Sequence, residues 1–137
     1  ELVRTMQRRL RRAQADAIYP TADGLTQLRQ ATTASLHFIA EHAPYFSFLD
    51  REQYGALRDA ELVRESGQVA VDDSVKFVQL GQAQGAIREG DPRLLAIGMM
   101  GTVSSFSHAF RRGVVDIDPD ELAEFAGDWL VRALERR

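Results

Sequence analysis

The spacing of the apolar side chains is the feature that most constrains this chain. Between its four prolines and ten glycines, apolar residues recur with a period near 3.6 along the whole sequence. No run alternates apolar and polar residues for the length that a half-buried strand requires. The sequence therefore predicts an all-α protein, and 137 residues suffice for one domain with a substantial core.

Composition excludes several classes of protein. Apolar residues make up 45% of the chain and charged residues 27%, as in soluble globular proteins and unlike disordered chains. The absence of cysteine excludes disulfides, thiolate metal sites and cysteine catalysis. The longest uncharged stretch, Leu94–Phe110, is 17 residues long and contains serine, threonine and histidine. Because a membrane-spanning helix needs about 20 strongly apolar residues, we expect no membrane span.

Helix start and stop signals divide the chain. Asp91-Pro92 and Asp118-Pro119 each combine an N-cap aspartate with a proline in the first turn. Gly67 would break a long helical segment, and Asp72 or Asp73 would cap its restart. The expected helices run from before Glu1 to about Ala17, from roughly Gly24 to His42, from Pro44 to Phe48, from about Gln53 to Arg88, from Asp91 to Gly113, and from Asp118 to near the C-terminus.

The expected helix from Asp91 to Gly113 has two distinct apolar faces. One is a stripe of small residues, Gly98, Gly101, Ser105 and Ala109, and the bulky stripe about 120° away is Leu95, Met99, Thr102, Val103, Phe106 and Phe110. Small residues allow another backbone to approach, so we expect this helix to lie between its own core and a partner subunit. The last helix would complete a dimeric four-helix bundle. The alternative is that both faces are buried within one chain. The expected interface residues are Gly98, Gly101, Ser105, His108, Ala109, Leu122, Phe125 and Trp129.

The polar residues form no recognisable catalytic constellation. His37 and Glu41 are one helical turn apart, which alone is a weak metal signal, and His108 fits a satisfied interface or core histidine. No nucleophile elbow, phosphate-binding loop or dinucleotide fingerprint occurs. We therefore expect no enzyme, no cofactor and no metal; an enzyme would need polar groups converging in the interior, for which His37, Glu41 and His42 are the nearby candidates.

Arginines cluster on the first helix, opposite its apolar stripe, at Arg4, Arg8, Arg9, Arg11 and Arg12. The simpler interpretation is a solvated helix face. The alternative is that this end of the molecule lies near nucleic acid and adds a weak attraction to phosphates.

Residues 81–96, GQAQGAIREGDPRLLA, resemble the junction between the two long helices of the TetR-family C-terminal domain. There, a helix ending in glycine and a short turn lead to Asp-Pro and the first dimerisation helix. The sequel is similar too, with Arg111-Arg112-Gly113, a loop, and then the run from Asp118 to Leu122. The resemblance extends over the whole chain in helix order and length. It implies a TetR C-terminal-like bundle in a homodimeric, cytoplasmic, bacterial transcriptional regulator, usually a repressor.

The resemblance also implies how such a regulator works. Residues 1–137 would be its effector-binding and dimerisation domain, and Glu1 to about Ala17 would be the end of a helix connecting to an absent helix-turn-helix head that reads operator DNA. A small apolar or amphipathic effector would enter a cavity in each subunit and release the repressor. The expected lining residues are Met6, Leu10, Phe38, His42, Phe77, Gln84, Met99, Val103 and Phe106. The same residues also fit a plain core, and a free-standing helical dimerisation adaptor, without ligand or DNA binding, is the alternative function.

Overall fold

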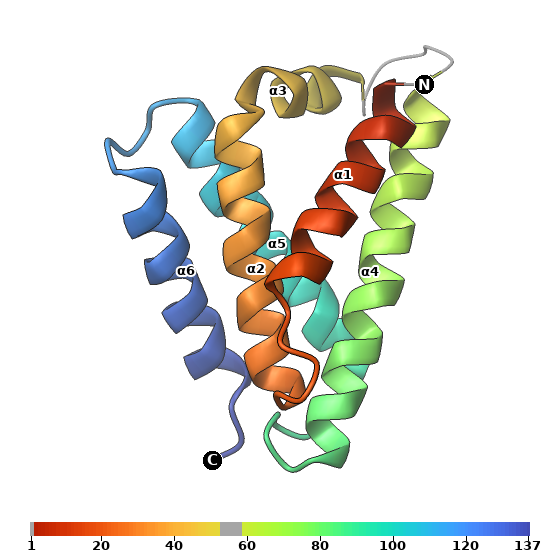
Figure 1. Ribbon diagram of the computed structural model, residues 1–137, viewed down its shortest axis with the longest axis vertical. Coiled ribbons are helices and arrows are strands. Elements are labelled where there is room, and N and C mark those ends of the chain that lie inside the picture. The colour runs from red at the N-terminus through yellow and green to blue at the C-terminus, as the bar shows by residue number, and fades with distance from the viewer. Residues whose placement is uncertain (1, 53–58) are drawn as a thin grey trace.

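The computed structural model describes residues 2–52 and 59–137, and within them every regular element is a helix (Figure 1). The all-α prediction is confirmed. The helices are α1 (Leu2–Ala17), α2 (Gly24–Glu41), α3 (Ala43–Glu52), α4 (Asp59–Ala83), α5 (Pro92–Arg111) and α6 (Pro119–Leu134). None of these described helices combines the length and the apolar character that a membrane span requires.

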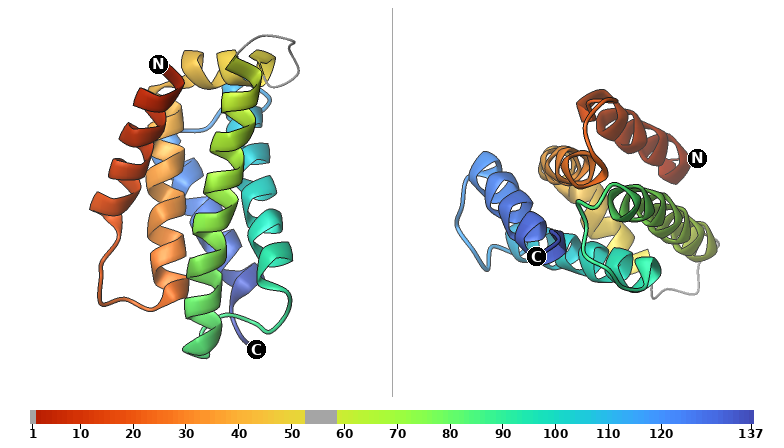
Figure 2. Two further views of the ribbon diagram at one scale, coloured as in Figure 1. Left: turned by 90° about the vertical axis from the view of Figure 1, so that its right-hand side faces the viewer. Right: turned by 90° about the horizontal axis from the view of Figure 1, so that it is seen from below.

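Helix α2 is the centre of the bundle. It contacts each of the other five helices, with α1 and α6 on opposite sides of it (Figures 1 and 2). Helix α3 lies across one end of the bundle, and the loop from α4 to α5 lies at the other. Two buried clusters fill the interior between the long helices. The first is Leu28, Val78, Ile87, Ala96, Met99, Leu130 and Leu134, and the second is Leu36, Ala123 and Ala126.

The helix starts predicted at the two Asp-Pro pairs are confirmed. The backbone N–H of Arg93 donates to the Asp91 carboxylate at 2.9 Å, and that of Asp120 donates to the Asp118 carboxylate at 2.8 Å. Each aspartate thereby satisfies a backbone donor that the first turn leaves free. Gly113 follows the end of α5 with a φ of 71°, a left-handed conformation that favours glycine.

The predicted break at Gly67 is wrong, because α4 runs without interruption through this residue. Asp72 and Asp73 therefore lie inside the helix and do not cap it. Asp72 pairs with Arg93 of α5 at 3.2 Å, and Asp73 pairs with Arg11 of α1 at 3.0 Å. A glycine inside a helix costs only about 1 kcal/mol relative to alanine. The packing of α4 against α1, α2 and α5 outweighs that cost.

Two other helix boundaries differ from the prediction. Helix α3 continues to Glu52 and not only to Phe48, whereas α4 ends at Ala83 and not at Arg88. The predicted start of the long helix at Gln53 lies outside the described residues. After α4 the chain turns at Gly85, whose φ is 74°, and then extends along the C-terminal tail. The N–H of Arg88 donates to the carbonyl of Leu134 at 2.7 Å, and the N–H of Arg136 donates to that of Ala86 at 3.0 Å.

The first turn of α2 lies against the backbone of α4. A Cβ placed on Gly24 would lie 2.7 Å from the Phe77 carbonyl oxygen and closer still to the Gly81 amide nitrogen. Because both atoms belong to the backbone, neither can move aside cheaply. The crossing of α2 and α4 therefore requires a residue without a side chain at this position.

Replacing this glycine should be costly, whereas the same change at Gly67 should not. We expect Gly24→Ala to lower the free energy of unfolding by about 1–3 kcal/mol through overpacking. A Cβ at Gly67 meets no atom within 4 Å, so Gly67→Ala should raise it by about 0.4–1 kcal/mol. Urea denaturation of both variants measures the difference, and equal stabilities would contradict the close approach.

Candidate functional site

Helix α5 has one face toward the interior and one toward solvent. Met99 is buried in the first cluster, while Gly98, Gly101 and Ser105 of the small stripe are exposed. A Cβ added at Gly98 or at Gly101 would meet no atom within 4 Å. The predicted division of this helix into a bulky inner face and a small outer face is therefore present in the single chain, with the outer face uncovered.

Helix α6 adds two large aromatic side chains beside this face. Phe125 is 56% exposed and Trp129 is 48% exposed. Phe106 of α5 packs edge-on against both rings, at centroid distances of 5.9 Å and 6.3 Å. The two helices thus present a joint outer region, here named the α5–α6 surface. It consists of Leu94, Ile97, Gly98, Gly101, Ser105, His108, Phe125 and Trp129, all of them exposed.

Two of the expected interface residues are less exposed than the others. Leu122 is only 5% exposed and belongs to the inner face of α6, together with Ala123 and Ala126. Its side chain is therefore occupied within its own chain. Ala109 is half-buried at the edge of the small stripe. Helical periodicity placed Leu122 and Phe125 on one wide apolar face, but α2 covers only part of that face.

The expected ligand-lining residues are distributed over several parts of the bundle. Phe77, Met99 and Val103 meet at the first cluster, and Phe106 packs against the second. At the end of α2 near α3, the rings of Phe38 and His42 lie 4.3 Å apart.

The remaining expected lining residues lie apart from these. Met6 is buried in α1, and Leu10, one turn later, is half-buried. Gln84 is exposed beyond the end of α4, where its Oε1 accepts a hydrogen bond from the N–H of Gly24 at 2.6 Å. This glutamine thus holds the first turn of α2, whereas Phe38 lies in the last turn of the same helix.

A narrow hollow lies between α2, α5 and α6. Its walls are Leu25, Leu28, Arg29, Thr32, Met99, Leu130, Val131 and Leu134, and it is too small to admit a water molecule. Of the expected lining residues, only Met99 borders it. In this form of the protein, the described side chains around that hollow are in close contact and leave no space for a ligand.

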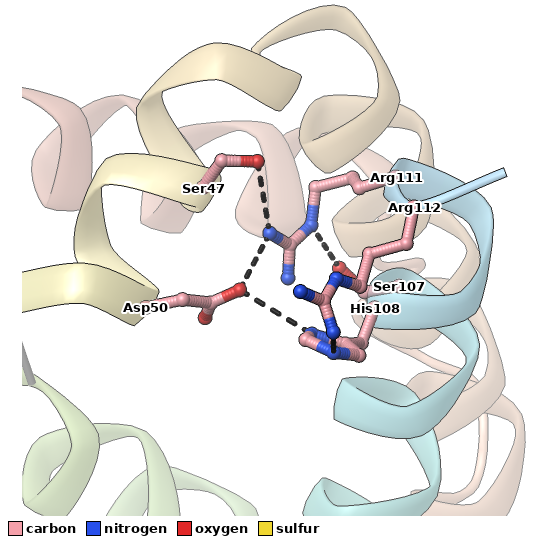
Figure 3. A network of polar contacts seen from close by, with 6 residues as sticks. All are labelled: Ser47, Asp50, Ser107, His108, Arg111 and Arg112. Atoms are coloured by element: carbon pink, nitrogen blue, oxygen red, sulfur yellow. Dashed lines mark hydrogen bonds and ion pairs between the residues drawn. The ribbon is translucent and has the colours of Figure 1, made fainter.

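A polar network between α3 and α5 is the part of the site that sequence reasoning missed (Figure 3). The Arg111 guanidinium, whose side chain is only 6% exposed, donates from Nη1 to the Asp50 carboxylate at 2.7 Å and to the Ser47 hydroxyl at 3.3 Å. Its Nε donates to the hydroxyl of Ser107 at 3.0 Å. The Nδ1 atom of His108 lies 3.4 Å from the same Asp50 oxygen. The sequence contains one signal of this network, a serine one helical turn before Arg111. The carboxylate partner, Asp50 on α3, is too distant in the sequence for helical spacing to indicate it.

Two other side chains singled out in the sequence, His37 and Arg11, each lie close to a carboxylate of another helix. His37 lies 3.2 Å from Asp120 of α6 instead of pairing with Glu41. Within the part of the chain that the structure describes, no three histidine or carboxylate side chains converge as metal ligands would. The five arginines of α1 are exposed, and Arg11 among them pairs with Asp73.

The arrangement of the helices matches that of solved bacterial structures. A protein of unknown function from Rhodococcus sp. RHA1 aligns with a TM-score of 0.80 and 24% identity, over 98% of this chain and 70% of that one. A bacterial regulatory protein in the TetR family from Rhodococcus RHA1 aligns with a TM-score of 0.77 and 13% identity, over 97% of this chain and 70% of that one. No family model and no curated protein matches the sequence. The chain therefore has the fold of that TetR-family protein over nearly its whole length.

The aromatic cluster at α3 allows a prediction of how the stability of the folded protein changes at alkaline pH. Tyr45 packs against Phe46 and Phe48, and its burial raises the pKa of the phenol above the usual 10.0. A raised pKa in the folded state means that the contribution of this group is complete below pH 10 and is lost as the pH rises through the folded-state pKa. Urea denaturation from neutral pH to about pH 11 should show a steeper loss of stability in the wild type than in Tyr45→Phe. The exposed Tyr19→Phe variant is the control and should follow the wild type.

Proposed function

We propose that this chain is the effector-binding and dimerisation part of a TetR-like transcriptional regulator, most simply a repressor. The observation that carries the proposal is the uncovered α5–α6 surface, on a fold shared with a bacterial regulatory protein. In this proposal the surface joins two copies of the chain. An N-terminal helix-turn-helix head outside residues 1–137 reads operator DNA, and α1 connects the two parts.

The chemistry of the α5–α6 surface supports a second copy of the chain as its partner. Large apolar side chains such as Leu94 and Trp129 gain about 25 cal/mol for each Å² of apolar area removed from water. Gly98 and Gly101 leave a shallow strip along α5 that large side chains of another molecule can enter. A surface with both features is self-complementary, as a two-fold interface must be. Two α5–α6 pairs would then form a four-helix bundle.

The attachment of α1 supports a role in transmitting a signal. Only Val3 and Met6 of this helix are buried, and polar side chains join it to α2 and to α4. Arg11 pairs with Asp73 of α4 at 3.0 Å, and Gln14 donates to the hydroxyl of Ser35 in α2 at 2.8 Å. A ligand acts on such a helix only by binding one of its positions better than another. In the proposed mechanism, the effector separates side chains that now touch and shifts α1 with them.

The dimer can be tested with one glycine substitution and a matched control. Gly101→Arg puts a long charged side chain on the α5–α6 surface and should weaken association about tenfold or more. Gly67→Arg makes the same change at another helical glycine with open space around it and should leave association unchanged. Size-exclusion chromatography with light scattering at micromolar concentration measures both variants. A monomeric wild type, or a Gly101→Arg variant as dimeric as Gly67→Arg, would refute the proposed interface.

The effector can be tested with a ligand panel of apolar and amphipathic compounds. A ligand present at 100 times its Kd stabilises the folded protein by about 2.7 kcal/mol. We expect at least one compound to raise the melting temperature and to change hydrogen exchange in α1. Failure of every lipid, aromatic compound and antibiotic in the panel would argue against effector binding.

The close packing around the hollow favours one alternative, a helical adaptor that dimerises without a ligand or DNA. The sequence that precedes Glu1 in the parent gene distinguishes the two functions. A helix-turn-helix pattern there supports the regulator, and its absence supports the adaptor.

A further inference from the structure

Helix α3 contacts α2 and α4, and polar side chains join it to α5. It lies across the helix termini, and neither of the two buried clusters contains a residue of α3 (Figure 1). Phe46 packs edge-on against Phe38 of α2 at 6.1 Å. The next residue, Ser47, and Asp50, one turn further along α3, both contact Arg111 in the last turn of α5. The position of α3 relative to α5 therefore depends on these polar contacts.

The contact with Arg111 fixes the end of α3. The side chain of Arg111 is 6% exposed, so its charge needs a partner, and Asp50 at 2.7 Å is the carboxylate that supplies one. The Asp50 side chain is 41% exposed, but loss of its carboxylate would leave the largely buried Arg111 charge without compensation, which is destabilising. Movement of α3 away from α5 would have the same effect, because it would separate Asp50 from the guanidinium. Asp50 thus holds α3 in its observed position.

The same carboxylate also contacts the α5–α6 surface. His108 follows Gly101 and Ser105 at helical spacing, so it lies on the outer face of α5. Its Nδ1 is 3.4 Å from the Asp50 oxygen that Arg111 binds, and its Nε2 is 3.5 Å from Nη1 of Arg112. Figure 3 shows the Asp50 carboxylate joined to both Arg111 and His108 of α5. One side chain of α3 is therefore shared between the interior and the surface.

We propose that Asp50 links the position of α3 to association through the α5–α6 surface. In the proposed dimer, the partner restricts His108, and a restricted His108 favours the position of Asp50 that Arg111 also requires. Docking of α3 and formation of the dimer then stabilise one another, and thermodynamic linkage makes the effect reciprocal. This inference rests on the proposed dimer. It adds a way in which a change in the position of α3 alters the stability of that dimer.

The first test replaces the shared carboxylate. Asp50→Asn should weaken the dimer about fivefold or more, within the range of coupling between linked sites, and should increase hydrogen exchange in residues 43–52. The control is Asp72→Asn, which removes the carboxylate that pairs α4 with Arg93 at the other end of α5. This control should change neither quantity. Sedimentation equilibrium gives the dimer Kd, and exchange mass spectrometry gives the protection of α3.

The second test runs in the reverse direction. The Gly101→Arg variant, which changes the surface and leaves α3 untouched, should raise hydrogen exchange in α3 to the level of the diluted, monomeric wild type. In a His108→Gln background, Asp50→Asn should have a smaller effect on the dimer Kd, because the link through the imidazole is already lost. If Asp50→Asn changes the dimer Kd as much in this background as in the wild type, Asp50 acts without His108. That result would overturn the route through the imidazole.

The outcomes separate this inference from the proposed function. A wild type that stays monomeric refutes the dimer itself. A wild-type dimer whose Kd is unchanged by Asp50→Asn, although α3 exchanges faster, refutes the linkage alone. If Asp50→Asn does not fold, Ser47→Ala removes the weaker 3.3 Å contact to Arg111 and should change both quantities in the same direction. No change in either quantity with a folded Ser47→Ala protein would then count against the proposal.

Discussion

The close approach of α2 to its neighbours is the constraint on which the rest of the bundle depends. At the first turn of α2, Gly24 lies against the backbone of α4 near Gly81. On the opposite side, Gly127 of α6 brings a second backbone near, since a Cβ there would lie 3.1 Å from a methyl group of Thr33. Arg29 of α2 reinforces this contact with ion pairs to two carboxylates of α6, at 3.0 Å and 2.6 Å. The positions of α4 and α6 are thus both set from α2.

This central position of α2 explains why the two aromatic rings of α6 lie outside the core. The inner face of α6 carries small or aliphatic residues where it meets α2, such as Ala123 and Ala126. Bulkier rings do not fit at that distance. Phe125 and Trp129 therefore lie on the outer side, where they pack with Phe106 instead of with α2. The α5–α6 surface follows from the same packing that forms the interior.

The features that the sequence predicted well are local ones. The caps at Asp91 and Asp118 depend on residues two positions apart, and helical spacing was enough to separate the two faces of α5. The features that it missed depend on tertiary contacts. Whether Gly67 interrupts α4 is decided by the neighbours of that helix, and the partner of Arg111 is 61 positions away in the sequence. The expected ligand-lining residues were chosen by helical face, which does not fix their height along the bundle, so Gln84 lies at the far end.

The backbone pairing near the C-terminus has a consequence for how forces act within the molecule. Arg88 and Leu134 are joined by a backbone hydrogen bond of 2.7 Å, so the segment between them forms a ring closed at its base. Both α5 and α6 belong to this ring, and α1, α3 and α4 do not. The ring is joined to the N-terminal helices above all through α2, whose Arg29 forms ion pairs with two carboxylates of α6. A displacement of those helices reaches the outer face through the side chains between α2 and α6 and through the backbone that joins α4 to α5.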